Sequence, residues 1–332
     1  MKKIFSMLLF GFLSLSVSSQ TAVSVAGFFP LPEQVSRGSG RTVYNFNLGW
    51  RFHRGDVAGA EAAVFDDLQW EVVSIPHSVQ LMPSEASGCR NYQGIAWYRK
   101  RFVVPEASEG KDVSIHFEAA MGKQVLYLNG DKVGEHQGGY LPFNLNLTDQ
   151  GVVAGDTCVV AVMVDNSNDK TFPPGKPQYT LDFSYHGGIY RDVSLISVSP
   201  IHISTTHYAS SGVYVNTPEI TEEKALVDIC TMLSNTQKVR SKIFVEHKIY
   251  SATGECVATS KKKVIVDTER EQAFNIQIVV NHPELWEIER PNLYRLQTCL
   301  WDNEGKLLDE VSNTFGIRTC SFSAEKGFEL NG

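Results

Sequence analysis

The chain has 332 residues, of which 42% are hydrophobic and 20% are charged, and its formal net charge at pH 7 is −7. That length allows two ordinary domains with separate cores, and the composition is typical of globular proteins. The longest basic run is Lys261–Lys263, so the charge pattern argues against a nucleic-acid partner and against binding to an acidic membrane surface.

The first segment has the pattern of a secretory signal peptide. Lys2 and Lys3 precede an apolar run that ends at Leu15, and small residues follow it. Because this run is short for a membrane span, the pattern predicts cleavage of residues 1–19, no membrane insertion, and export to the periplasm or the cell exterior. The alternative is an uncleaved anchor. Residues 20–40, rich in Ser, Gly and Pro, then predict a linker.

A first set of strands is predicted between residues 41 and 200, where the hydrophobic pattern has a period of two. Asn129-Gly130 lies between two alternating segments and predicts a hairpin turn. Cys158–Val164 is a continuous apolar run, which is typical of a strand buried on both faces. The alanine-rich segment Val57–Phe65 is the one that predicts a short helix.

A second set of strands follows Pro200 and fills residues 201–319. Its short apolar or alternating segments are separated by turn residues such as Thr253-Gly254-Glu255. Short strands at even spacing over about a hundred residues are typical of an immunoglobulin-like sandwich. The predicted fold class is therefore all-β, with one sandwich in each half of the chain.

A search for catalytic motifs is negative. The chain has no G-x-S-x-G elbow, P-loop, H-E-x-x-H or dinucleotide fingerprint, and its six cysteines lie singly, without zinc spacing. What remains are loops of the first domain rich in aromatic, Gly and polar residues: Asn91–Phe102, Gly134–Phe143 and Pro173–Val193. Aromatic faces beside Asp, Asn and His side chains can hold sugars. The same rings can equally form core, and the glycines can serve turns.

These loops, NYQGIAWYRKRF, LYLNGDKVGEHQGGYLPF and LDFSYHGGIYRDV, resemble the first domain of glycoside hydrolase family two, the β-galactosidase, β-glucuronidase and β-mannosidase family. GVYVNTPEI, PELWEIERPNLYRLQTCLW and FGIR resemble its immunoglobulin-like second domain. FELNG resembles the lead-in to its (β/α)₈ barrel. The resemblance implies a jelly-roll (galactose-binding-like) domain in residues 41–200 and the start of a barrel, cut short, in residues 320–332. It also implies that the two glutamates of retaining hydrolysis lie outside this chain, which is then inactive alone.

One substrate-binding residue follows from the resemblance most directly. In the β-galactosidases of this family an Asp six residues before a Gly-Ile pair reaches the active site, near the sugar 6-hydroxyl and a bound sodium. Asp182 precedes Gly188-Ile189 at that spacing, although the intervening residues 183–186 differ from the family pattern. Asn91, ahead of the W-Y-R motif, and His186, in the loop of Asp182, are further candidates. The implied ion is sodium or magnesium near the active site, and no other cofactor is expected.

The functional hypothesis is the N-terminal part of an exported retaining exo-β-glycosidase that acts on an oligo- or polysaccharide. β-Galactosidase is the first choice, because PPGKP followed by LDFSYHGGIYRDV is similar to galactosidase-like members. β-Glucuronidase and β-mannosidase are alternatives within the family. A free-standing carbohydrate-binding protein without a barrel is the alternative from another class. A homo-oligomer remains open.

Overall fold

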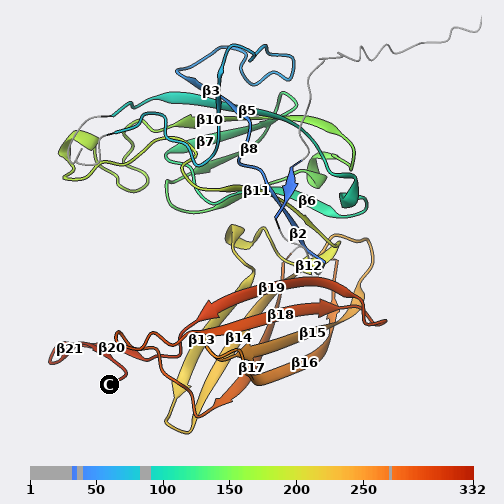
Figure 1. Ribbon diagram of the computed structural model, residues 1–332, viewed down its shortest axis with the longest axis vertical. Helices are drawn as coiled ribbons and strands as arrows, with labels where there is room; N and C mark the ends of the chain where they lie inside the picture. Colours follow the sequence, from blue (N-terminus) through green and yellow to red (C-terminus); the bar gives the residue numbers. More distant parts are fainter. Residues whose placement is uncertain (1–31, 36–39, 83–90, 269–270) are drawn as a thin grey trace, which may run out of the picture.

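The computed structural model describes residues 32–35, 40–82, 91–268 and 271–332, and Figure 1 shows two β-sandwiches, one above the other. The predicted signal peptide, residues 1–19, lies outside the described residues, as does most of the predicted linker. The prediction of an all-β fold is confirmed. In the described part of the chain, no helix is long and apolar enough to cross a membrane.

The first sandwich consists of two antiparallel sheets. One has the strand order β1 (Glu33–Gln34), β2 (Thr42–Asn45), β11 (Val193–Val198), β6 (Asp112–Phe117), β9 (Phe143–Asn146). The other has the order β4 (Glu71–Val73), β3 (Trp50–Arg54), β5 (Ile95–Val103), β10 (Thr157–Asp165), β7 (Lys123–Leu128), β8 (Asp131–Gln137). Apolar side chains from both sheets form one core, with Trp50, Tyr98 and Leu195 among its fully buried members. Short 3₁₀ turns lie at η1 (Glu106–Ser108), η2 (Thr148–Gln150) and η3 (Gln178–Thr180).

The second sandwich has its own core. In one sheet β14 (Lys224–Asn235) pairs with β12 (Ile201–Ile203), β13 (Val213–Ile220) and β17 (Gln272–Asn281). The other sheet has the order β16 (Cys256–Val266), β15 (Ser241–Tyr250), β18 (Tyr294–Trp301), β19 (Leu307–Phe315). The turn η4 (His207–Ala209) joins β12 to β13, and a hairpin of β20 (Cys320–Ser323) and β21 (Gly327–Leu330) follows β19.

Two local predictions have opposite outcomes. The hairpin turn is confirmed, because Asn129 and Gly130 join β7 to β8 with φ angles of 53° and 102°, the left-handed pair that a tight hairpin turn requires. The helix at Val57–Phe65 is wrong, because this segment forms successive turns. The guanidinium of Arg99 on β5 donates to the carbonyls of Ala60 and Ala62, which a helix would need for its own N–H groups.

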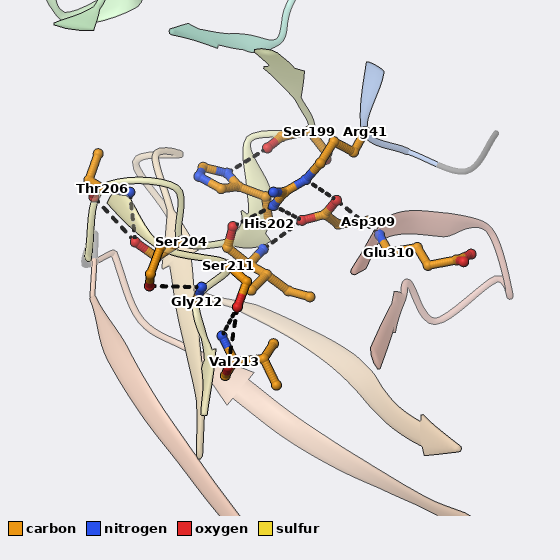
Figure 2. A network of polar contacts seen from close by, with 12 residues as sticks. Arg41, Ser199, His202, Ser204, Thr206, Ser211, Gly212, Val213, Asp309 and Glu310 are labelled. Atoms are coloured by element: carbon orange, nitrogen blue, oxygen red, sulfur yellow. Dashed lines mark hydrogen bonds and ion pairs between the residues drawn. The ribbon is translucent and has the colours of Figure 1, made fainter. Parts of the chain in front are cut away.

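The two sandwiches meet at a buried polar network, shown in Figure 2. Arg41, beside β2, reaches from the first sandwich to Asp309 on β19 and to the carbonyl of Ile203 on β12. His202 lies beside them and donates from Nδ1 to the carbonyl of Ser199 over 2.8 Å. Strand pairing changes from the first pair of sheets to the second between β11 and β12. The domain limits at residues 41, 200 and 319 stay a prediction.

Candidate active-site loops of the first sandwich

Three loops of the first sandwich come together at one end of the six-stranded sheet. They are residues 91–94 before β5, residues 138–142 between β8 and β9, and residues 166–192 between β10 and β11. The last is the long yellow-green loop at the left of the upper sandwich in Figure 1. It has little regular structure, so side-chain hydrogen bonds must fix its path.

Gln178 is the centre of these hydrogen bonds. Its side chain is buried, and its Oε1 accepts a hydrogen bond of 3.0 Å from the backbone N–H of Asn91. Its Nε2 donates to the carbonyl of Tyr185 over 3.4 Å, and its own N–H donates to Oδ1 of Asn168 over 3.1 Å. One buried amide therefore holds the segment before β5 against two parts of the long loop.

A second buried amide, Asn166, joins the same segment to the end of β10. Its Oδ1 accepts from the N–H of Gly94 over 2.9 Å, and its Nδ2 donates to the carbonyl of Tyr92 over 2.8 Å. The N–H of Tyr92 in turn donates to Oε1 of Gln80 over 2.7 Å. The segment after β4 is thereby tied into the same cluster.

Asn91, a candidate from the sequence, lies inside this cluster. Its Nδ2 donates to the carbonyl of Tyr185 over 2.5 Å. Its Oδ1 is enclosed and has no hydrogen-bond partner among the described residues. A buried acceptor without a donor is costly, so this oxygen is suited to accept from a buried water, or from a ligand hydroxyl once the surrounding residues move apart.

His186, the second candidate, is exposed and packs against the segment after β4. Its Nδ1 lies 3.2 Å from Oγ of Ser78, and that hydroxyl donates its own proton to the carbonyl of Gln80 over 2.9 Å. Ser78 must therefore accept from His186, which places the ring proton on Nδ1. Whenever the ring carries only this proton, its Nε2 lone pair is an acceptor.

Asp182, the third candidate, lies on the exposed part of the same loop, four residues before His186. Its neighbour Phe183 is exposed, whereas Tyr185 is buried. Asn91 thus contacts the long loop at Tyr185, the residue before His186, whereas Asp182 lies on an exposed part of that loop. Sugar contact by any of the three stays a prediction.

Tyrosines from two loops accompany these polar groups. The hydroxyl of Tyr190 donates to the carbonyl of Gly139, and Tyr185 receives a hydrogen bond of 3.3 Å from Nε2 of Gln93 on its hydroxyl. Burial raises the pKa of both tyrosines, so each stays a neutral phenol at pH 7. Tyr140 is half exposed beside them and offers a ring face at the surface.

Several of these residues were not predicted. Gln178 contacts the candidate Asn91, which is 87 residues away in the sequence, and Ser78 contacts the candidate His186, which is 108 residues away. Tyr140 and Tyr190 fall inside the aromatic loops that the sequence singled out, so composition was a signal for them. Gln178 also falls inside the singled-out segment Pro173–Val193, whereas no local signal marked Asn166.

The sodium or magnesium ion implied by the resemblance also stays a prediction. Carboxylate oxygens are ligands of the type these ions prefer, and Asp182 offers two. Within the described ranges, however, no group of three or more His, Cys, Asp or Glu side chains is close enough to hold a metal.

Comparison with known proteins places this architecture in a family. Residues 63–199 match the model of the glycosyl hydrolases family 2 sugar binding domain, and residues 208–318 match the model named glycosyl hydrolases family 2. The two models together cover most of the described chain, one on each sandwich.

Individual relatives agree with these matches. The beta-galactosidase BoGH2A of Bacteroides ovatus is 33% identical over 295 residues, which are 87% of this chain and 33% of the relative. A beta-glucuronidase of Formosa agariphila is 29% identical over 316 residues, 90% of this chain and 32% of the relative. The crystal structure of a Bacteroides uniformis beta-glucuronidase superposes with a TM-score of 0.80 at 31% identity, over 88% of this chain and 34% of that one. The chain spans about a third of the length of these relatives, and it belongs to glycosyl hydrolase family 2.

Proposed function

We propose that this chain is the N-terminal part of an exported retaining exo-β-glycosidase that removes terminal β-galactosyl units. The observation that carries the proposal is the cluster of Asn91, Gln178 and Tyr185, which fixes two of the polar, aromatic loops against each other at one end of the first sandwich. An enclosed amide oxygen, an imidazole acceptor and exposed rings are the groups that recognise sugar hydroxyls and their apolar faces. Retaining hydrolysis would need two carboxylates supplied from outside this chain.

β-Glucuronidase is the second specificity. It is favoured by the names of the Formosa agariphila and Bacteroides uniformis relatives, just as β-galactosidase is favoured by the name of the Bacteroides ovatus relative. β-Mannosidase and a free-standing carbohydrate-binding protein are outcomes that the same experiment separates.

The test compares this chain with the longer protein read from the same open reading frame. Both are assayed for release of nitrophenol from the β-galactoside, β-glucuronide and β-mannoside. We expect the longer protein to prefer the galactoside by at least about tenfold in kcat/KM. We expect the chain alone to be silent, because on this proposal the acid and the nucleophile are supplied from outside it. A preference for another glycoside would replace the specificity. Saccharide binding without hydrolysis by the longer protein would replace the enzyme with a binding protein. Cell fractionation, with a cytoplasmic marker as control, tests export.

A further inference from the structure

A cleft of about 490 Å³ lies beside β3 and β4, next to the candidate loops. Its polar lining includes Glu71, Ser78 and His77, and Trp70 supplies an aromatic wall. The cleft is large enough for a small ligand. Ser78 also bonds His186, so it stands between the cleft and the candidate loops.

His77 is held in one orientation and one tautomer. Its Nδ1 lies 2.9 Å from the hydroxyl of Tyr98, which is fully buried and takes a backbone hydrogen bond from Ile189. Burial raises the pKa of Tyr98, so the phenol keeps its proton and donates it to Nδ1. Burial also lowers the pKa of His77, which is therefore neutral at pH 7. The ring proton must then be on Nε2, which has no partner among the residues that the structure describes.

This arrangement depends on a glycine of the candidate loop. Gly188 has φ of +105°, and a Cβ atom there would lie 2.5 Å from the Tyr98 hydroxyl and 2.8 Å from the carbonyl of His77. The loop that carries His186 therefore also leaves room for the contact that fixes His77. The two sites share one framework.

The lining of the cleft also has a hydrogen-bond acceptor. Glu71 is exposed, and its carboxylate is near enough to His77 to raise the pKa of that ring, against the larger effect of burial. Trp70 is held edge-on by Phe65, with ring centroids 5.4 Å apart. Arg54, also on the lining, lies over the ring of Tyr92 at 5.6 Å from its centroid.

A fixed N–H donor and a carboxylate acceptor on the lining of one cleft match a sugar hydroxyl pair, in which one oxygen accepts and the next hydroxyl donates. A ligand carboxylate placed beside Glu71 would be repelled by it, although Arg54 is also on the lining. We propose that this cleft is a second saccharide site, in which His77 Nε2 donates to one hydroxyl and Glu71 accepts from another hydroxyl of a neutral sugar. Because Ser78 borders both sites, the cleft takes a sugar unit beyond the one at the candidate loops. The choice of carbohydrate as the ligand class rests on the proposed function.

The test uses the 332-residue chain with ¹⁵N-labelled histidine and a neutral β-galactotriose as probe. In the free chain, His77 should show an acceptor-type Nδ1 and a protonated Nε2, and the trisaccharide should shift the Nε2 resonance. Glu71→Gln and His77→Phe should each weaken binding by about tenfold, as loss of one hydrogen bond to a charged or fixed group predicts. Glu109→Gln is the matched control and should not change affinity. Glu109 is an exposed carboxylate that directly follows η1 in the same sandwich.

Tyr98→Phe keeps the ring in the core and removes only the donor to Nδ1. It should alter the tautomer signal of His77 and weaken trisaccharide binding, with circular dichroism and melting temperature showing that the fold persists. Binding with unchanged affinity in Glu71→Gln and Tyr98→Phe would overturn the proposal, and so would tighter binding of glucuronic acid than of galactose. These results are separable from the proposed function. If the longer protein hydrolyses a glycoside but the cleft binds no saccharide, only the proposed second site is rejected. If the cleft binds saccharide but the longer protein hydrolyses none, only the proposed glycosidase activity is rejected.

Discussion

Arg41 and Asp309 form a bidentate ion pair between the sandwiches. Nε of Arg41 lies 3.0 Å from Oδ1 of Asp309, and Nη2 of Arg41 lies 2.8 Å from Oδ2. The carboxylate is fully buried and also accepts the backbone N–H groups of Ile203 and Glu310, over 2.8 and 2.9 Å. Both of its oxygens are thus satisfied by two donors each. The buried carboxylate depends on all of these donors together. Removing the Arg41 side chain would leave its negative charge buried without compensation, which destabilises the fold.

Arg41→Met should therefore destabilise the chain by about 3 kcal/mol, the usual result of breaking a buried pair. The measurement is the free energy of unfolding in urea. Lys132→Met is the control, because the Lys132–Glu135 pair is exposed and should change nothing measurable. The double variant Arg41→Met/Asp309→Leu should recover part of the loss, and additivity of the two single changes would contradict the coupling.

His247 should make the second sandwich sensitive to acid. It is fully buried, its Nε2 lies 3.0 Å from Oγ1 of Thr231, and burial lowers its pKa from 6.5 to about 4. Between these values the unfolded chain binds a proton that the folded chain does not, so stability falls as pH falls from 6.5 to 4, by about 3 kcal/mol.

The measurement is urea unfolding at several pH values in that window, followed by a signal from the second sandwich. His247→Gln keeps a polar side chain but cannot titrate, and its stability should depend less on pH. An exposed histidine changed in the same way, His282→Gln, is the control. Identical pH slopes for wild type and His247→Gln would show that this ring does not carry the effect.

The stability of the first sandwich should likewise depend on pH, in the alkaline range, through the pKa of Lys100. It lies in the core of the first sandwich, donates to the carbonyl of Leu48 and sits 4.5 Å from the centroid of Phe46. Burial lowers the pKa of Lys100 from 10.5 to about 8. In that window the unfolded chain holds the proton and the folded chain loses it, so stability should rise with pH by about 3 kcal/mol.

Unfolding experiments from pH 7.5 to 9.5 cover the useful part of this range, before the tyrosines titrate. Lys100→Met fills the same space without a charge, so its stability should lack the rise with pH that Lys100 contributes and should be higher than wild type at pH 7. Lys111→Met, at a lysine that is only partly buried, is the control and should keep the wild-type slope. A less stable Lys100→Met at pH 7 would mean that the carbonyl and ring contacts outweigh the cost of burying the ammonium.

Asp182→Asn tests the residue that the family resemblance singles out, and it needs the longer protein. The change keeps shape and hydrogen bonding but removes the charge. If the carboxylate contacts sugar or a cation, kcat/KM should fall by about 1.5–3 kcal/mol in transition-state stabilisation, as for a hydrogen bond to a charged group. Melting temperature should hardly move, because Asp182 is exposed. A lower melting temperature with unchanged kinetics would give Asp182 a structural role.

The sequence predicted those features that depend on local chemistry. Asn129-Gly130 forms its turn because few other residue pairs tolerate two positive φ angles. The hairpin is therefore predictable from these two residues alone. Val57–Phe65 failed for the opposite reason: its helix propensity is overridden by Arg99, which is distant in sequence and uses its carbonyls.

The candidate site was predictable only in part, for the same physical reason. Motif spacing made Asp182 a candidate, and Asn91 and His186 were added because they lie beside motif residues. In the structure Asn91 contacts Tyr185, the neighbour of His186, but sugar contact by the three stays a prediction. The groups that hold the cluster, Gln178 and Ser78, act through partners far along the chain. Their side chains carry no local signal, because any amide or hydroxyl looks alike until the fold supplies its partner.

The contact between Arg41 and Asp309 also constrains the order in which the molecule is made. The two residues are 268 positions apart, and Asp309 lies on β19, the last strand of the second sandwich. During synthesis the first sandwich can fold while the Arg41 side chain is still in solvent, because Asp309 has not yet been translated. The Arg41–Asp309 clamp between the sandwiches can therefore close only after the ribosome has passed residue 309 and β19 has joined its sheet.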